Sequence, residues 1–342
     1  MVTIKDIANY TGVSPTTVSN VIHERDNKVS PETRDKVKKA LKELNYTANM
    51  GGRLLAKHGS KIIGMIIQDN AAEKENVYDN PYYGELIQSV ESCVKQSGYF
   101  MMFHRVADFE EGAKLAEMWH LESLIVSGAS SQEVTKWQNR VSIPIVFVDT
   151  YASFDSLEPK LNVGIKDREG AYELTRYLLE KGHKKIIFLA KGEKSDQWVG
   201  ADYERAEGVK QAMLEQGLTP LLQGMPTTYK HYHTFVQTEL EEKITDYTAI
   251  FCASDLLGVQ IISELYKKGI RVPTDVSVVS FDGTLLSRYA TPQLTSMSQD
   301  VSLKAQKIVE LAIQGIESNN TLAKKVVLET ELVEGDSVQE ID

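Results

Sequence analysis

The sequence predicts an all-α helix-turn-helix head followed by an α/β body of two doubly wound parallel-sheet subdomains. A chain of 342 residues is longer than one compact core usually accommodates. Short helical patterns fill the first 46 residues, whereas apolar strand-like runs alternate with helical stretches from residue 61 onward. Basic residues outnumber acidic ones ten to six in the first sixty residues, although the whole chain carries a net charge of −10. This asymmetry predicts a polyanion-binding head on an acidic body.

The composition excludes several classes of protein. Hydrophobic residues make up 42% and charged residues 25% of the chain, which is typical of a globular protein and not of a disordered or coiled-coil one. The two cysteines, Cys93 and Cys252, exclude a disulfide scaffold and a multi-cysteine metal site. No apolar run reaches the roughly 18 residues of a membrane helix, and the N-terminus lacks a secretory signal. We therefore expect a cytoplasmic protein with no membrane partner.

Three short helices are expected in the head. Thr3 is suited to cap the first helix with Asp6 as its capping-box partner, and Gly12 is suited to end it. Ser14-Pro15 and Ser30-Pro31 each place a hydroxyl at an N-cap and a proline at the first helical position. About three residues separate the first two helices, which is the turn length of a helix-turn-helix. The expected inward-facing residues are Ile4, Ile7, Ala8, Thr11, Val18, Val21, Ile22, Val37, Ala40, Leu41 and Leu44.

The second helix has the character of a DNA-reading helix. Its outward residues are small and polar, so its backbone can approach the edges of the bases in a major groove. The amide of Asn20 has the geometry for a bidentate pair with adenine, whereas Pro15 can offer only an apolar contact. The alternative is an ordinary helical bundle with a polar surface.

The body is predicted from apolar runs that alternate with amphipathic stretches. Near-continuous apolar strands indicate parallel sheets covered by helices on both faces. In such sheets ligands bind at the carboxyl ends of the strands, here in a cleft between two facing units. We expect strands at 62–67, 99–103, 124–126, 144–148, 185–189, 249–252 and 276–281, and helices at about 83–97, 110–119, 168–181, 203–216 and 257–268.

The head resembles that of the lactose/galactose repressor (LacI/GalR) family. The resemblance is carried by residues 3–8, 12–14, 17–22, 29–33 and 44–46. It implies that Pro15, Thr16 and Asn20 face the bases of a pseudo-palindromic, double-stranded operator, which a homodimer binds with two heads. The DNA-binding residues implied by the match are Thr3, Ser14, Pro15, Thr16, Thr17, Asn20, Asn49, Arg53 and Leu55.

The segment after the head, residues 47–60, departs from the hinge of that family. The usual form is Tyr-x-Pro-Asn-x-x-Ala-Arg-x-Leu, whereas this chain has Ala48 in place of proline and Gly52 in place of alanine. A glycine inside a helix costs about 1 kcal/mol relative to alanine, so we expect a hinge that orders only on DNA. Leu55 is the residue that the family wedges into the minor groove; the alternative is that Leu54 or Leu55 packs on the body.

The body resembles the same family, whose effector domain is a periplasmic-binding-protein-like pair of subdomains. The local matches are at 80–83, 182–186, 205–208, 253–255, 269–277, 281–283 and 291–295. The resemblance implies that the chain crosses between subdomains near residues 160, 292 and 323. The expected domains are a head at 1–46, a hinge at 47–60 and an effector-binding and dimerisation domain at 61–342. Its N-subdomain is placed at about 61–160 and 293–322, and its C-subdomain at about 161–292 and 323–342.

The resemblance also implies an effector site. Tyr82 would stack on a sugar ring, while Arg205 and Asp255 would bind adjacent hydroxyl groups. Asp149 follows a predicted strand and should face the cleft, unless it caps a helix as strand-end aspartates often do. Asp69 and Trp198 are further candidates, although a loop tryptophan is often a packing residue, and Arg205 could instead be solvated.

No catalytic or cofactor motif is found. The sequence lacks a Gly-x-Ser-x-Gly elbow, a phosphate-binding loop and a dinucleotide fingerprint, so no enzyme activity, cofactor or metal is expected. The predicted function is a sequence-specific transcriptional regulator, a repressor, controlled by a small effector such as a sugar or sugar derivative. One alternative stays open, a catabolite-control-type regulator whose co-regulator is a phosphorylated carrier protein. An exported binding protein for transport would share the body, but the missing secretory signal and the basic head argue against it.

Overall fold

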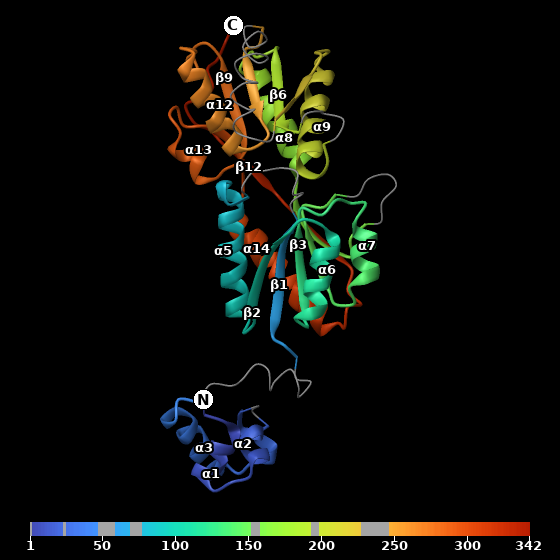
Figure 1. Cartoon of the computed structure of the whole chain (residues 1–342). Helices are drawn as coiled ribbons and strands as arrows, with labels where there is room; N and C mark the ends of the chain where they lie inside the picture. The colour runs from blue at the N-terminus through green and yellow to red at the C-terminus, as the bar shows by residue number, and fades with distance from the viewer. Residues whose placement is uncertain are drawn as a thin grey trace. The chain divides into compact units, whose positions relative to one another are not determined.

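A computed structural model describes residues 2–22, 25–46, 59–68, 77–151, 158–192, 198–226 and 246–342. Its internal contacts divide the chain into two units, Met1–Ser60 and Lys61–Asp342 (Figure 1). Among these described residues, no helix combines the length and the apolar character that crossing a membrane requires.

The first unit is a three-helix head, as predicted. It contains α1 (Ile4–Thr11), α2 (Pro15–Ile22), a 3₁₀ turn (Asp26–Lys28) and α3 (Pro31–Glu43). Thr3 and Asp6 form the expected capping box, and Gly12 ends α1 with a φ of 66°, which L side chains rarely adopt. The residues of the small core are the predicted ones, with Ile7, Ala8, Val18, Val21, Val37 and Ala40 buried.

The second unit consists of two lobes, and the first, called the N-lobe, is built on a six-stranded parallel sheet. The strand order is β11-β5-β4-β3-β1-β2. Helices α5 (Pro81–Gln96) and α14 (Val301–Glu317) cover one face, while α6 (Phe109–Met118) and α7 (Val134–Arg140) cover the other. The strands are β1 (Ile62–Gln68), β2 (Phe100–Val106), β3 (Ser123–Ser127), β4 (Ile145–Val148), β5 (Leu161–Ile165) and β11 (Lys324–Leu328).

The second lobe, called the C-lobe, has a six-stranded sheet of order β12-β10-β9-β8-β6-β7. The sheet is parallel except for its edge strand β12, which runs antiparallel to β10. Helices α8 (Asp167–Glu180) and α9 (Gly200–Glu215) cover one face, and α12 (Asp255–Lys267) with α13 (Leu285–Tyr289) covers the other. The strands are β6 (Ile186–Lys191), β7 (Leu221–Met225), β8 (Ala249–Cys252), β9 (Ser277–Asp282), β10 (Thr295–Gln299) and β12 (Thr330–Val333).

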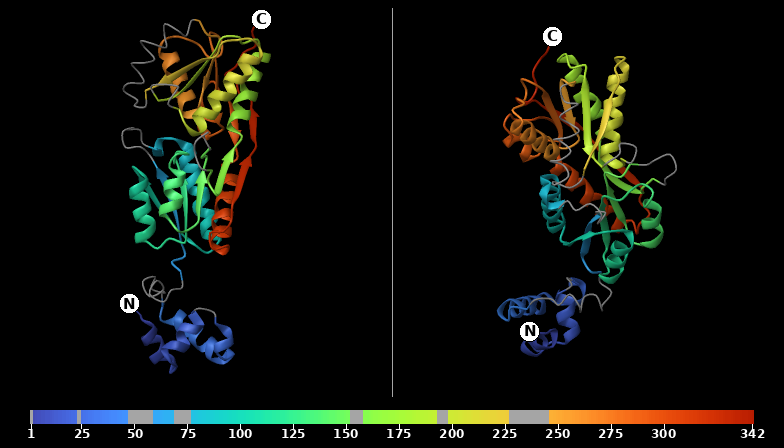
Figure 2. Two further views of the ribbon diagram at one scale, coloured as in Figure 1. Left: turned by 90° about the vertical axis from the view of Figure 1, so that its right-hand side faces the viewer. Right: turned by 45° about the horizontal axis from the view of Figure 1, so that its top comes forward.

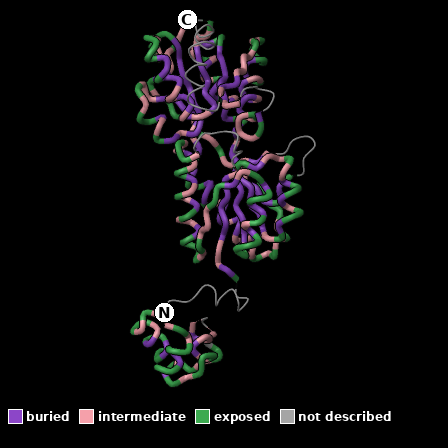
Figure 3. The backbone as a smooth tube through the Cα atoms, in the orientation of Figure 1, coloured by how far each residue is buried: buried purple, intermediate pink, exposed green. Residues whose placement is uncertain are grey.

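The central strands of both sheets are buried along most of their length. Residues 63–67 of β1 and all residues of β3, β4, β8 and β9 are buried, and Figure 3 shows buried strands between helices whose outer faces are exposed. Helices cover both faces of each sheet, which explains why the strand sequences are almost continuously apolar instead of alternating between apolar and polar residues. The predicted doubly wound α/β architecture is confirmed, with β12 as an antiparallel addition.

The crossings between the lobes lie a few residues later than expected. Strand β5 still belongs to the N-lobe sheet and β10 to the C-lobe sheet, so the first two crossings follow Ile165 and Gln299 instead of residues 160 and 292. The third lies between β11 and β12, not near residue 323. The Lys166 N–H donates to the Leu328 carbonyl at 2.9 Å, and Gln299 is the register partner of Thr330, so the crossings lie side by side (Figure 2).

Candidate functional site

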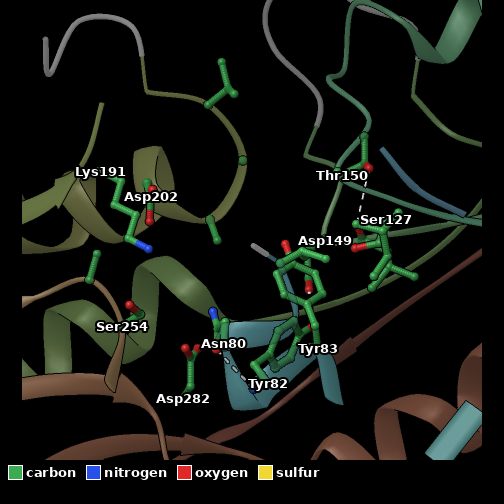
Figure 4. Close-up of a pocket in the computed structure, with 18 of the residues that line it drawn as sticks. Asn80, Tyr82, Tyr83, Ser127, Asp149, Thr150, Lys191, Asp202, Ser254 and Asp282 are labelled. Atoms are coloured by element: carbon green, nitrogen blue, oxygen red, sulfur yellow. Dashed lines mark hydrogen bonds between the residues drawn. The ribbon is translucent and has the colours of Figure 1, made fainter. Parts of the chain in front are cut away.

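A cavity of about 370 Å³ lies in the body where strand ends of the two lobes meet (Figure 4). Its lining includes residues at or directly after the carboxyl ends of seven strands from both sheets. These residues are Gln68, Ser127, Asp149, Lys191, Ala253, Asp282 and Gln299. Loops that follow parallel strands converge at one edge of a sheet, which explains why residues distant in sequence share this cavity.

The backbone around the cavity is tightly constrained. Gly128 has a φ of 87°, and a Cβ there would collide with the carbonyl oxygen of Gln68. Asp149 and Asp282, the two aspartates that line the cavity at strand ends, have φ values of 51° and 111°. Aspartates tolerate such angles only at a cost of about 1–3 kcal/mol, and residues held this way cluster at functional sites.

The N-lobe side of the cavity presents Tyr82 and Asp149, and Lys304 holds both of them from behind the lining. The Tyr82 hydroxyl donates to Asp149 Oδ2 at 2.9 Å, and the fully buried Lys304 ammonium lies 2.8 Å from the same oxygen and 2.9 Å from Oδ1. Burial and the neighbouring Asp149 carboxylate raise the pKa of Tyr82 well above 10, so its hydroxyl stays protonated. Tyr82 and Tyr83, which also lines the cavity, contact each other edge to face at 5.3 Å.

The C-lobe side is centred on Arg205, which is 5% exposed. Its Nε donates to Asp167 at 2.7 Å, and its two terminal nitrogens donate to the Ala253 carbonyl at 2.5 Å and to Asp282 at 3.1 Å. The guanidinium also stacks over the Phe281 ring at 3.8 Å. Burial raises the pKa of Asp282 to about 7 against the opposing effect of Arg205, so this carboxyl group titrates near neutrality.

Gln299 joins the two sides. Its carboxamide oxygen accepts from Lys304 Nζ at 2.6 Å, and its nitrogen donates to Asp282 Oδ1 at 3.0 Å. Because Gln299 ends β10 in the C-lobe sheet and Lys304 lies on α14 over the N-lobe sheet, this side chain couples hydrogen bonds of both lobes.

Three of the six expected effector residues line the cavity: Tyr82, Asp149 and Arg205. Asp149 is not a helix cap, because its carboxylate pairs with Lys304, and Arg205 is not solvated. Asp69 falls outside the described residues.

Asp255 does not face the cavity in this structure. It is wholly buried, and its carboxylate accepts from the Ser280 and Ser296 hydroxyls at 2.6 and 2.7 Å and from the Thr284 amide and hydroxyl at 2.6 and 2.9 Å. Burial raises the pKa of Asp255, while these hydrogen bonds oppose that rise. Helix α12 begins at Asp255, two residues before the predicted start, and the Asp255 side chain points into the lobe and ties α12, β9 and β10 together.

Trp198 likewise packs inside the C-lobe and is absent from the cavity lining. Its ring meets Phe188 edge to face at 5.4 Å and is 7% exposed, as the packing alternative anticipated. Its buried indole N–H has no hydrogen-bond acceptor among the described residues.

Lys304, Gln299 and Asp167 are site residues that sequence reasoning missed. For Lys304 a signal was available, since it lies on the buried face of an amphipathic helix together with Val301, Ala305 and Ile308. Charged residues are rarely found on such a face unless they are paired. For Gln299 and Asp167 the sequence offers no comparable signal.

In the head, the outward face of α2 presents the predicted small residues. Pro15 and Thr16 are exposed and Asn20 is half-buried. Ser14 caps α2: its hydroxyl oxygen accepts from the Thr17 amide at 3.1 Å. Thr3 is occupied in the capping box of α1. Asn49, Arg53 and Leu55 lie outside the described residues, as does the whole segment 47–58.

Comparison with known proteins gives two domain matches. Residues 3–49 match the model of bacterial regulatory proteins of the lacI family, and residues 175–338 match a periplasmic binding protein-like domain. The chain is 30% identical to the HTH-type transcriptional regulator MalR of Clostridium butyricum over 98% of both proteins.

Solved structures agree with these matches. The complex of the transcriptional regulator CelR with cellobiose superposes with a TM-score of 0.70 at 26% identity, over 98% of this chain and 100% of that one. A Lac repressor dimer bound to operator and the anti-inducer ONPF superposes with a TM-score of 0.84 at 23% identity over 99% of both chains, which shows the same fold.

Proposed function

Because the chain belongs to the LacI family of bacterial regulatory proteins, we propose that its head binds a specific operator and that a small effector in the body cavity changes this binding. The protein is a DNA-binding transcriptional regulator and not an enzyme. A repressor acting as a homodimer on a pseudo-palindromic site fits a single head per chain, since two heads then read two half-sites.

The observation that supports an effector most directly is the composition of the cavity. Strand ends of both lobes bring carboxylate, amide, hydroxyl and guanidinium groups to one space, and Tyr82 and Tyr83 add aromatic surface. A sugar needs such partners, hydrogen-bonding groups for its hydroxyls and an apolar wall for its C–H face. We therefore propose a sugar or sugar derivative as effector, of the class seen in the CelR–cellobiose complex.

Effector control follows if the ligand binds one arrangement of the lobes better than another. A ligand shifts DNA affinity only by the difference between its affinities for the two arrangements. Groups that line the cavity from both lobes, linked through Gln299, are the contacts that such a difference would change.

The DNA-binding proposal is tested by selecting operators from genomic fragments and measuring affinity by fluorescence anisotropy. Asn20→Ala should weaken binding to the selected site by about 1–3 kcal/mol and relax discrimination at one base pair. Asn9→Ala, which changes an exposed asparagine of α1, is the matched control. Equal losses on selected and random duplexes would show that Asn20 does not read bases.

The effector proposal is tested by a thermal-shift screen of neutral sugars, sugar phosphates and purines, followed by operator binding with each ligand that raises the unfolding midpoint. The proposal expects at least one sugar both to stabilise the body and to change operator affinity. If stabilising ligands leave operator affinity unchanged, the cavity is not the control site.

A further inference from the structure

Lys304 stands apart as the one buried lysine in the described part of the chain. It projects from α14, and its side chain has no exposed surface. An unpaired ammonium group in such a place is strongly unfavourable, so the surrounding acceptors determine whether it is tolerated.

The ammonium group of Lys304 is fully engaged by groups that line the cavity. Its three N–H donors meet the Asp149 carboxylate at 2.8 and 2.9 Å, the Gln299 carboxamide oxygen at 2.6 Å and the Tyr82 hydroxyl at 3.2 Å. Lys304 itself is not part of the lining, whereas all three partners are. The lysine therefore acts on a ligand through the residues it holds.

The other cations around the cavity also have acidic neighbours. Among the described residues, the cations Lys191, Arg205 and Lys304 face the carboxylates Asp149, Asp167, Asp202 and Asp282. Arg205 is paired with Asp167 and Asp282, and neither Lys191 nor Asp202 is without a partner. A phosphoryl group would bring about 1.5 to 2 further negative charges, for which this set offers no unpaired cation.

We propose that Lys304 is a specificity-determining residue: it serves as a built-in counter-cation for Asp149 and restricts the cavity to uncharged polyhydroxy ligands. The inference rests on the proposed function, because it takes this cavity to be the effector site. Without the lysine, Asp149 would present an unpaired carboxylate to the cavity, and the site would accept an ammonium group instead.

The pairing can be tested without an identified effector, by chemical rescue. Lys304→Ala removes three methylene groups and the ammonium, which together correspond to n-propylammonium. We expect the variant to unfold at a lower temperature, and n-propylammonium to restore most of the loss in a saturable manner. The uncharged analogue 1-propanol should restore none of it. Lys307→Ala, which changes a half-buried lysine on α14 that pairs with Glu310, is the matched control and should not respond to the amine.

The counter-cation role would be overturned if n-propylammonium and 1-propanol raised the unfolding temperature of Lys304→Ala equally. It would also be overturned if the amine raised the unfolding temperatures of Lys304→Ala and Lys307→Ala equally. If Lys304→Ala does not fold, Lys304→Met with and without Asp149→Asn replaces it. The double variant should then be more stable than Lys304→Met alone, because no charge is left unpaired. A double variant that is no more stable than the single one would equally overturn the proposal.

The restriction to uncharged ligands is tested on the wild-type protein with cellobiose, glucose, glucosamine and glucose 6-phosphate. A rise of the unfolding midpoint with glucose 6-phosphate or with glucosamine, both of which are charged, would overturn the restriction. If no sugar raises the midpoint but n-propylammonium rescues Lys304→Ala, the sugar effector is refuted and the role of Lys304 stands. If a sugar alters operator binding but n-propylammonium does not restore the stability of Lys304→Ala, the proposed function stands and the proposed role of Lys304 is refuted.

Discussion

Removing the guanidinium of Arg205 should destabilise the body strongly. Arg205→Met keeps an apolar side chain over Phe281 but leaves Asp167 and Asp282, which are 1% and 6% exposed, without their common cation. It also removes the donor to the Ala253 carbonyl. Deleting one partner of a buried ion pair typically costs about 3–5 kcal/mol, because the remaining charge stays buried.

The assay is urea unfolding followed by tryptophan fluorescence at pH 8, where Asp282 of the wild-type protein is mostly ionised. Arg168→Met is the matched control, since Arg168 pairs with Glu204 at 2.7 Å but is 43% exposed. Because Glu204 is 17% exposed and stays in contact with solvent, this pair should contribute only about 1 kcal/mol, so the two variants should differ several-fold in lost unfolding free energy.

The losses of unfolding free energy caused by substitutions in this network should not add. Adding Asp167→Asn to Arg205→Met removes one of the unpaired carboxylates and should recover part of the loss. If Arg205→Met costs no more than Arg168→Met, or if Asp167→Asn only adds to the damage, the network does not carry the charge balance inferred from its geometry.

Three further predictions concern other parts of the molecule. Since folding raises the pKa of Asp282 from 3.8 to about 7, the folded state retains a proton that the unfolded state releases, so unfolding free energy should fall as pH rises from 4 to 7. Asp282→Asn should flatten this slope in urea titrations at several pH values; an unchanged slope would assign it to other groups. Asp255→Ala leaves four donors without an acceptor and should cost at least about 3 kcal/mol of unfolding free energy. A variant with wild-type stability but no effector response would instead restore Asp255 to the site. Thr3→Ala breaks the capping box and should cost the head about 1 kcal/mol, measured by thermal unfolding monitored by circular dichroism, whereas the exposed Lys5→Ala should change little.

Much of the fold could be predicted because its elements are locally encoded. The caps of α1 and α3 and the apolar runs of β1, β4 and β8 depend on neighbouring residues alone. Strand β10 was not predicted, because its buried residues Thr295, Ser296 and Gln299 are polar. Each of them is satisfied by hydrogen bonds to residues remote in sequence, such as Ser337 and Asp255.

The site was predictable only where position in a motif fixes position in space. Tyr82 and Arg205 were implied by the family resemblance, and Asp149 directly follows the predicted strand β4. Lys304 meets Tyr82 across 222 residues of sequence, and no local pattern relates the two. For Asp255, the sequence located the backbone correctly, but three hydroxyl-bearing residues from other elements determine where the carboxylate points.

The three crossings between the lobes are joined to one another by backbone hydrogen bonds. Backbone hydrogen bonds tie Lys166 to Leu328, and the pairing of β10 with β12 joins the second crossing to the third. Three chain segments held together in this way resist separation of the lobes far more than they resist bending. A disulfide engineered between two of the crossings should therefore leave the lobes free to move and the cavity free to open and close. A disulfide that joins the N-lobe wall of the cavity to the C-lobe wall should hold the lobes in one arrangement.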